Sequence, residues 1–196
     1  MRHYSKQWAS AAAITVAALT VAACTTEPSH SRSQSAPSGQ WALQTLKPAP
    51  ADEDIQTRVD APPDKSKARI LGVADIAEAR LIIALRDDTC QVMTLPADGH
   101  SHTAPSSVGA PRPSSKAAVS EERQTFPGKI LSGPYSQASG IAAPYFPYIY
   151  LGCSESGIAV QVEGVAPDVK VALAGDSARS WRDGTNLYIA IGRTSS

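Results

Sequence analysis

The last seventy residues alternate between apolar runs and turn-forming residues, a pattern that predicts a β domain. Four runs rich in β-branched and aromatic residues are separated by Gly, Pro and Asp. In one of them Val169, Val171 and Leu173 alternate with other residues, which gives the strand one buried and one solvated face. Short strands at close intervals predict a mainly β fold, either a small antiparallel sandwich or a partly open barrel. The four runs span residues 148–151, 158–165, 169–173 and 186–191.

An earlier pair of apolar runs predicts a β-hairpin. Residues 80–86 and 89–95 flank a two-residue Asp-Asp turn. In the second run Cys90 and Val92 share one face, which places the cysteine on or beside the core. The apolar residues before the hairpin follow helical spacing, so we expect a helix or turn at 75–79 and a strand after it.

Polar stretches define the expected domain organisation. Residues 24–67 are rich in Ser, Pro, Ala and Gln, and such a segment buries too little apolar surface to offset its ordering entropy. We therefore expect a disordered tether there, followed by a single β domain over 68–196 with a disordered insertion at about 97–125. The insertion either carries function or is tolerated. The apolar island 40–46 within the tether could dock on the domain, serve as a contact motif or form a loose turn.

The first 24 residues have the three-part organisation of a secretory signal. Arg2 and Lys6 precede an uncharged, alanine-rich run over residues 9–23. This run is shorter than the ~20 residues of a transmembrane helix. Its end, Val21-Ala22-Ala23-Cys24, resembles the lipobox of bacterial lipoproteins, which implies a signal peptide over 1–23 and lipidation of Cys24. The resemblance implies anchoring to the extracytoplasmic face of the cell membrane, or to an outer membrane if the source has one.

Lipidation of Cys24 leaves Cys90 and Cys153 as the remaining cysteines. Disulfides persist outside the cytoplasm, so we expect these two to be bonded, with two buried free thiols as the alternative. Removal of residues 1–23 takes two basic residues from a formal balance of 18 basic against 18 acidic, which leaves 16 against 18. This balance argues against nucleic acid as a partner, because phosphate binding needs a clustered basic surface.

Enzyme motifs are missing from the sequence, which contains no Gly-x-Ser-x-Gly elbow, phosphate loop or dinucleotide fingerprint. The histidines after residue 23 lie in the tether (His30) and in the insertion (His100 and His102), where no rigid scaffold holds a general base. His100 and His102 have the spacing of a metal-binding pair, but a loop is poorly organised for coordination, so we expect neither metal nor cofactor. The acidic residues 52–54 are the carboxylates considered for acid–base chemistry.

An aromatic segment at 133–150 is the candidate binding surface. Tyrosine offers a wide apolar face with a polar tip and loses little rotamer entropy on binding. Filling of the small core is the alternative role for these rings. The residues concerned are Tyr135, Tyr145, Phe146 and Tyr148.

Residues 162–193 resemble a small β unit of secreted actinobacterial proteins. A Gly-Val-Ala-Pro-Asp-Val turn leads into a valine-rich strand, and an Asp-Gly turn leads into an aromatic one. The resemblance implies a fold rather than an activity, and the chain departs from the unit at Tyr188 and Ile189, where Trp and Phe are frequent.

These patterns lead to one expected function and two alternatives. We expect a lipid-anchored extracytoplasmic protein whose noncatalytic β head binds an unidentified envelope protein or ligand. The alternatives are a carboxylate-dependent cell-envelope hydrolase and a structural envelope component.

Overall fold

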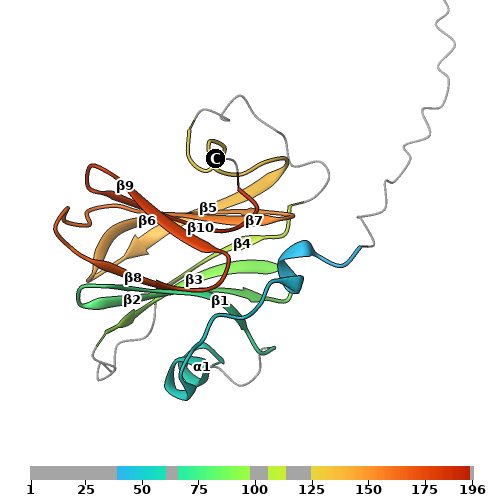
Figure 1. Cartoon of the computed structure of the whole chain (residues 1–196), viewed down its shortest axis with the longest axis horizontal. Coiled ribbons are helices and arrows are strands. Elements are labelled where there is room, and N and C mark those ends of the chain that lie inside the picture. The colour runs from blue at the N-terminus through green and yellow to red at the C-terminus, as the bar shows by residue number, and fades with distance from the viewer. Residues whose placement is uncertain (1–38, 61–65, 98–105, 114–124, 195–196) are drawn as a thin grey trace, which may run out of the picture. The chain divides into compact units, whose positions relative to one another are not determined.

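The computed structural model describes residues 39–60, 66–97, 106–113 and 125–194, which all lie within one compact unit. Ten antiparallel strands in this part of the chain form two five-stranded sheets that pack face to face without closing into a barrel (Figure 1). The mainly β prediction is confirmed, and of the two expected architectures the protein adopts the sandwich.

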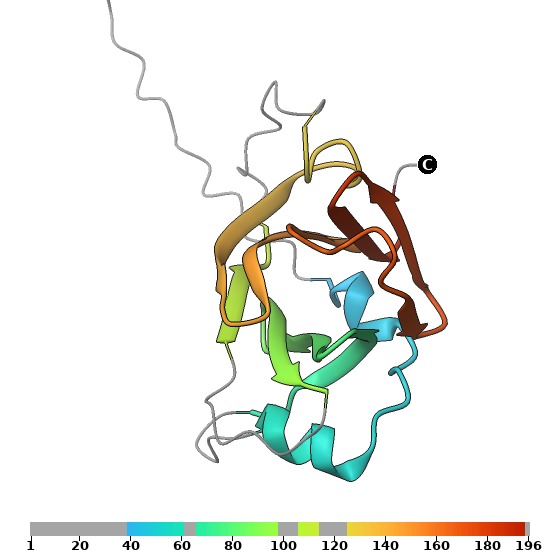
Figure 2. The ribbon, with the colours of Figure 1, turned by 90° about the vertical axis from the view of Figure 1, so that its left-hand side faces the viewer.

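Sheet A is a meander of four strands with a fifth strand added from the C-terminal half of the chain (Figure 2). Its order is β4-β3-β2-β1-β8, with β1 over Arg69–Ile76, β2 over Ala79–Arg86, β3 over Thr89–Pro96, β4 over Ser106–Pro111 and β8 over Val171–Ala174. Sheet B has the order β5-β6-β7-β10-β9, with β5 over Tyr135–Ala142, β6 over Phe146–Ser154, β7 over Gly157–Val162, β9 over Ala178–Asp183 and β10 over Asn186–Gly192. The chain therefore leaves sheet B after β7, adds β8 to sheet A and returns with β9.

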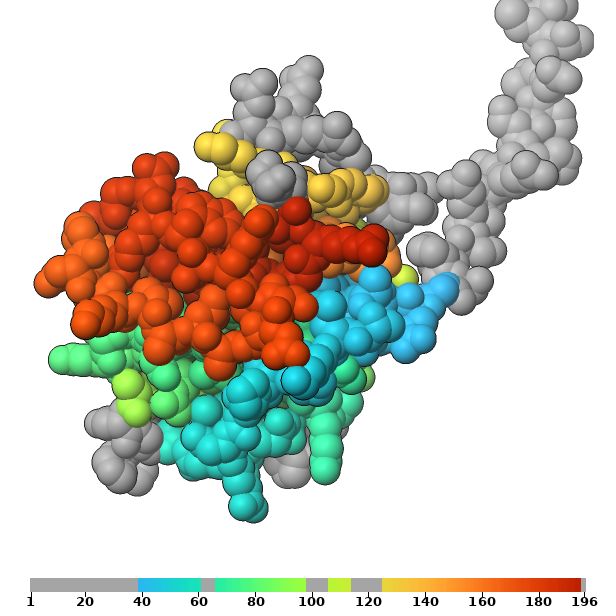
Figure 3. All heavy atoms as spheres, in the orientation of Figure 1, coloured from blue at the N-terminus to red at the C-terminus, as the bar shows by residue number. Residues whose placement is uncertain are grey.

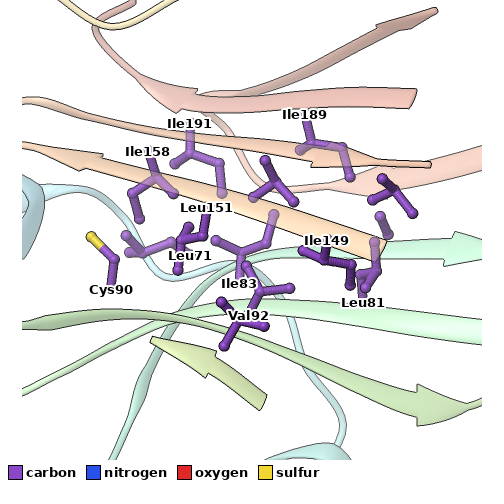
Figure 4. Packing of buried hydrophobic residues seen from close by; sticks show 14 of the residues in the cluster. Leu71, Leu81, Ile83, Cys90, Val92, Ile149, Leu151, Ile158, Ile189 and Ile191 are labelled. Carbon is purple, nitrogen blue, oxygen red and sulfur yellow. The ribbon is translucent and has the colours of Figure 1, made fainter. Parts of the chain in front are cut away.

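The main core lies between the two sheets. Leu81 and Ile83 of β2 face Ile149, Leu151 and Ile189 of sheet B, and these side chains are at most 1% exposed (Figure 4). Burial of each such side chain contributes about 1.5–3 kcal/mol relative to its exposure to water. Alternate positions on the strands of sheet B point to the opposite face, which carries the candidate site.

The outer face of sheet A is also buried, because helix α1 (Glu53–Asp60) covers it (Figure 1). Ile55 and Val59 of the helix pack against Ile82 and Met93 of the sheet. Strand β2 is consequently apolar on both faces, which explains why its sequence is a continuous apolar run rather than an alternating one.

The tether prediction is wrong for residues 39–60. Trp41 and Leu43, at the start of the 3₁₀ helix η1 (Ala42–Thr45), are fully buried in the main core, and Trp41 Nε1 donates to the Ser154 carbonyl oxygen at 3.1 Å. Of the alternatives for the apolar island, docking on the domain is confirmed. The composition of the segment is polar on average, but its few large apolar side chains are buried against the two sheets.

Of two further expectations about secondary structure, one is confirmed in one of its alternatives and the other is wrong. Residues 75–79 form the end of β1, a tight turn with Ala77 at φ 51°, and the start of β2, so the turn is confirmed and the helix is not. Strand β1 contacts the core on one face and α1 on the other, so its apolar residues imitate helical spacing. Residues 106–111, expected in a disordered insertion, form β4 and pair with β3.

The structure contains the expected disulfide. Cys90 on β3 is bonded to Cys153 on β6, with the two Cα atoms 6.0 Å apart, and both residues are fully buried. The bond therefore joins sheet A to sheet B through the core. Among the described residues, no helix combines the length and apolar character needed to cross a membrane.

Candidate functional site

A row of five side chains crosses the outer face of sheet B at right angles to the strands. Consecutive strands pair Trp181 with Tyr188, Tyr188 with Gln161, Gln161 with Tyr150, and Tyr150 with Ser139. Directly paired residues point to the same face of a sheet, and their sequence neighbours on β6, β7 and β10 are buried in the core. The whole row therefore points away from the core. We call it the cross-strand row.

Aromatic contacts connect the two ends of the cross-strand row. The Trp181 ring stacks on Tyr188 with centroids 5.5 Å apart and planes 11° apart. Phe126 lies above the sheet and contacts both Tyr188, at 5.9 Å, and Tyr150, at 6.5 Å. Tyr148 contacts Tyr150 at 4.8 Å. Each ring is held by at least one other ring, so the aromatic surface is ordered before any ligand arrives.

The segment 125–131 forms a wall beside the cross-strand row, and Figures 1 and 2 show it in yellow above sheet B. It packs over three small residues in the middle of the adjacent row of the sheet, Gly152, Ala159 and Ala190. A Cβ atom on Gly152 would lie 2.4 Å from Cβ of Pro127, so no larger residue fits there. These small residues let the segment approach the sheet closely and carry Phe126 over the aromatic rings.

A groove of about 690 Å³ lies between this wall and strands β9 and β10. In Figure 3 the yellow atoms of the segment lie next to the red atoms of β9 and β10. Phe126, Ile130, Tyr188 and Trp181 line its apolar part, and its volume falls within the ~300–1,000 Å³ typical of ligand sites. Trp181 is 37% exposed, which is unusual for the largest apolar side chain.

The rim of the groove is polar and of mixed charge. Lys129 and Arg179 are basic, Asp183 is acidic and Gln161 is neutral. The Arg179 guanidinium lies 5.6 Å from the centre of the Trp181 ring, a cation–π distance, and donates to the Thr194 hydroxyl oxygen. The groove thus presents hydrogen-bond donors and acceptors around an aromatic floor.

A second hollow of about 370 Å³ lies on the other side of Phe126 and includes Gln137, Ser139 and Tyr150. The Tyr148 hydroxyl is 3.3 Å from the Ser139 hydroxyl. The pKa of Tyr150 is raised because neighbouring atoms desolvate its hydroxyl, and because the Glu163 carboxylate adds negative charge and accepts a hydrogen bond from it. The Tyr150 hydroxyl thus donates to Glu163, and its oxygen can still accept a hydrogen bond.

Arg182 fixes the position of β9 at the edge of sheet B. Its guanidinium donates to the carbonyl oxygens of Ala166, at 3.1 Å, and of Val169, both in the connection between β7 and β8. The strand that carries Trp181 is therefore attached to the sandwich by these hydrogen bonds as well as by its pairing with β10.

The four aromatic residues predicted as a binding surface do not lie together. Tyr135 is 8% exposed beneath segment 125–131, and Phe146, at 6%, belongs to the main core, so the core-filling alternative is confirmed for these two. Tyr145 packs against the main core, and Tyr148 lies on the outer face beside Tyr150. Sequence reasoning missed Phe126, Trp181 and the outward role of Tyr188. The available signal was a lone tryptophan in a short segment that is otherwise polar and charged, residues 178–183.

The remaining candidates have structural roles or lie outside the described residues. Asp52 caps α1 by accepting from the Ile55 N–H at 2.8 Å, and Glu53 and Asp54 occupy the first helical turn. Cys24, His30, His100 and His102 lie outside the described residues, so lipidation and metal binding there stay predictions. The residues that the structure describes include no cluster of three or more potential metal ligands.

Comparisons with protein-family models, with curated proteins and with solved structures found no match for this chain.

Proposed function

We propose that this protein is a noncatalytic, lipid-anchored binding protein of the cell envelope, whose β head holds its ligand in the groove beside Trp181. The observation that carries the proposal is the exposed Trp181 ring, stacked on Tyr188 at the edge of a groove of about 690 Å³. A ring held in place by its neighbours loses little rotamer entropy when a ligand covers it.

The chemistry of the groove favours a ligand with a flat apolar face and polar edges. Aromatic rings form the floor, and Gln161, Asp183 and Lys129 supply amide, carboxylate and ammonium groups nearby. A few polar groups around an apolar floor are the usual arrangement of small-molecule and oligomer sites. Aromatic rings contact the flat face of a ligand and the polar groups bind its edges, so the groove favours ligands that have both features.

The proposed anchor at Cys24 limits how far the head can stand from the membrane. Fifteen residue steps separate Cys24 from Gly39, the first described residue. A fully extended chain spans at most ~3.3–3.6 Å per residue, so these two residues are at most about 54 Å apart. The ligand is therefore expected in the layer of the envelope next to the anchoring membrane.

Sedimentation with isolated cell envelopes tests this function. We expect the unlipidated chain, residues 25–196, to sediment with the envelopes, and Trp181→Ala in the same chain to reduce the bound fraction at least tenfold with an unchanged melting temperature. Ile141→Ala is the matched control because Ile141 is also a large exposed apolar residue, at 66%, but lies on β5 outside the groove. Equal sedimentation of wild type and Trp181→Ala would overturn the proposal. Release of soluble fragments from the envelopes would favour the hydrolase alternative.

A further inference from the structure

We infer that the ligand is a linear carbohydrate chain that lies along the cross-strand row and occupies both hollows. The inference rests on the proposed binding function and adds the chemical class of the ligand and its path. The two hollows lie on opposite sides of Phe126, and both are lined by members of the same row. Phe126 thus lies between the two hollows, and a chain that occupies both must pass this side chain.

Aromatic and polar side chains follow each other along the row, and a chain of sugar rings can contact both kinds of side chain. A pyranose ring presents C–H groups on its faces and hydroxyl groups around its edge. The negative faces of aromatic rings attract such C–H groups, and here they are supplied by Trp181 with Tyr188 at one end and by Tyr150 at the other. Gln161 lies between the two aromatic groups in the register of the sheet.

Side chains along the row can satisfy hydroxyl groups, each of which donates and accepts a hydrogen bond. Gln161 and Gln137 both donate and accept through their amides, Asp183 accepts, and the Tyr150 hydroxyl oxygen can accept. A ligand with only acceptors or only donors would leave part of this set unpaired. A carbohydrate chain matches both kinds of side chain, because each of its hydroxyl groups can donate and accept a hydrogen bond.

The sheet face is poorly suited to an extended peptide. Peptides that bind to sheets usually pair with an open strand edge through backbone hydrogen bonds. Gln161 of β7 and Tyr188 of β10 form the floor of the groove, and each of these strands pairs with neighbours on both sides. The third lining strand, β9, is an edge strand of sheet B, but a peptide that paired with its open edge would extend the sheet sideways and would not lie across the row.

The charges of the groove argue against a polyanion. Its lining contains Lys129 and Arg179 against Asp183, a formal sum of two positive charges and one negative charge. At the other end of the row the Glu163 carboxylate lies close enough to raise the pKa of Tyr150. A polyanion needs clustered positive charge, whereas a neutral chain of sugars needs none.

A length series of oligosaccharides tests the inference. The probes are soluble oligosaccharides released from protease-digested cell envelopes, separated by length and titrated by calorimetry into mature protein. We expect affinity to rise with length and to level off once the chain reaches both hollows. Trp181→Ala should weaken binding at least tenfold at every length, and Tyr150→Ala should weaken about tenfold only the longer oligosaccharides. Ile141→Ala should bind as the wild type does, and the melting temperatures of all variants identify any loss of folding.

The outcomes separate this inference from the proposed function. Trp181-dependent binding to untreated envelopes that is lost after protease digestion identifies a peptide ligand, which overturns the carbohydrate class and leaves the binding function in place. Affinity independent of oligosaccharide length, or equal effects of Tyr150→Ala at all lengths, overturns the two-hollow path. Absence of Trp181-dependent binding to untreated envelopes overturns the proposed function as well.

Discussion

The Cys90–Cys153 disulfide is expected to supply a large part of the free energy of unfolding. It joins β3 of sheet A to β6 of sheet B across a sequence separation of 63 residues. In the chain-entropy description, a loop of this length removes about 4 kcal/mol of conformational freedom from the unfolded chain at 25 °C. A domain of this size loses about 2–4 °C in melting temperature per kcal/mol. Loss of the bond should therefore lower the melting temperature by roughly 8–16 °C.

The double variant Cys90→Ala/Cys153→Ala provides the cleanest assay, because both sulfur atoms are buried in the native protein and resist reducing agents. Its melting curve is compared with those of the oxidised wild type and of wild type refolded under reducing conditions. We expect the two chains that lack the disulfide, the double variant and the reduced wild type, to melt at similar temperatures, well below the oxidised protein. A double variant that melts within about 3 °C of the oxidised wild type would refute the entropic reasoning. Free thiols at both positions in protein isolated from envelopes would refute the pairing itself.

Three further predictions follow from other parts of the chain. Trp41→Ala should cost about 3–5 kcal/mol in unfolding free energy, because Trp41 is fully buried and donates to Ser154; denaturant unfolding with less than ~1 kcal/mol lost would contradict its role in the core. Burial opposes ionisation of Asp60, but hydrogen bonds from Gln56 and the Ala68 N–H outweigh it and lower its pKa. Asp60→Asn should therefore be less stable than wild type at pH 7, with the difference lost as the pH falls from ~3.9, the unfolded value, through the lower folded pKa; a pH-independent difference would contradict this. Radiolabelled palmitate should enter the wild-type protein and not Cys24→Ala; label in the variant would contradict the anchor.

The strands that could be predicted from the sequence are those that coincide with a short apolar run bounded by turn residues. The β2–β3 hairpin and strands β6, β7, β8 and β10 all overlap predicted apolar runs. Strand β1 was not predicted, because its apolar residues follow helical spacing. Strands β5 and β9 lie at the edges of sheet B, where polar and charged side chains are tolerated, so their sequences lack the apolar signal.

The candidate site could not be predicted because it depends on strand order. Trp181, Tyr188, Gln161, Tyr150 and Ser139 come from five strands whose spatial order, β5-β6-β7-β10-β9, differs from their order in the chain. Residue types alone do not determine that order or the register. The aromatic segment that attracted attention in the sequence instead supplies mostly core residues, because a buried ring and an exposed ring have the same local pattern.

Fluorescence of Trp181 is the most direct test of the central claim that the groove beside it binds the ligand. After removal of the proposed signal peptide the chain contains two tryptophans, Trp41 and Trp181, and Trp41 is fully buried away from the groove, beside Ser154. Titration of mature protein with solubilised envelope fragments should give a saturable change in emission, and Trp181→Phe should abolish that change while retaining the Trp41 signal. The same change in both proteins, or no change at concentrations where the fragments bind the wild type, would place the ligand elsewhere and contradict the account.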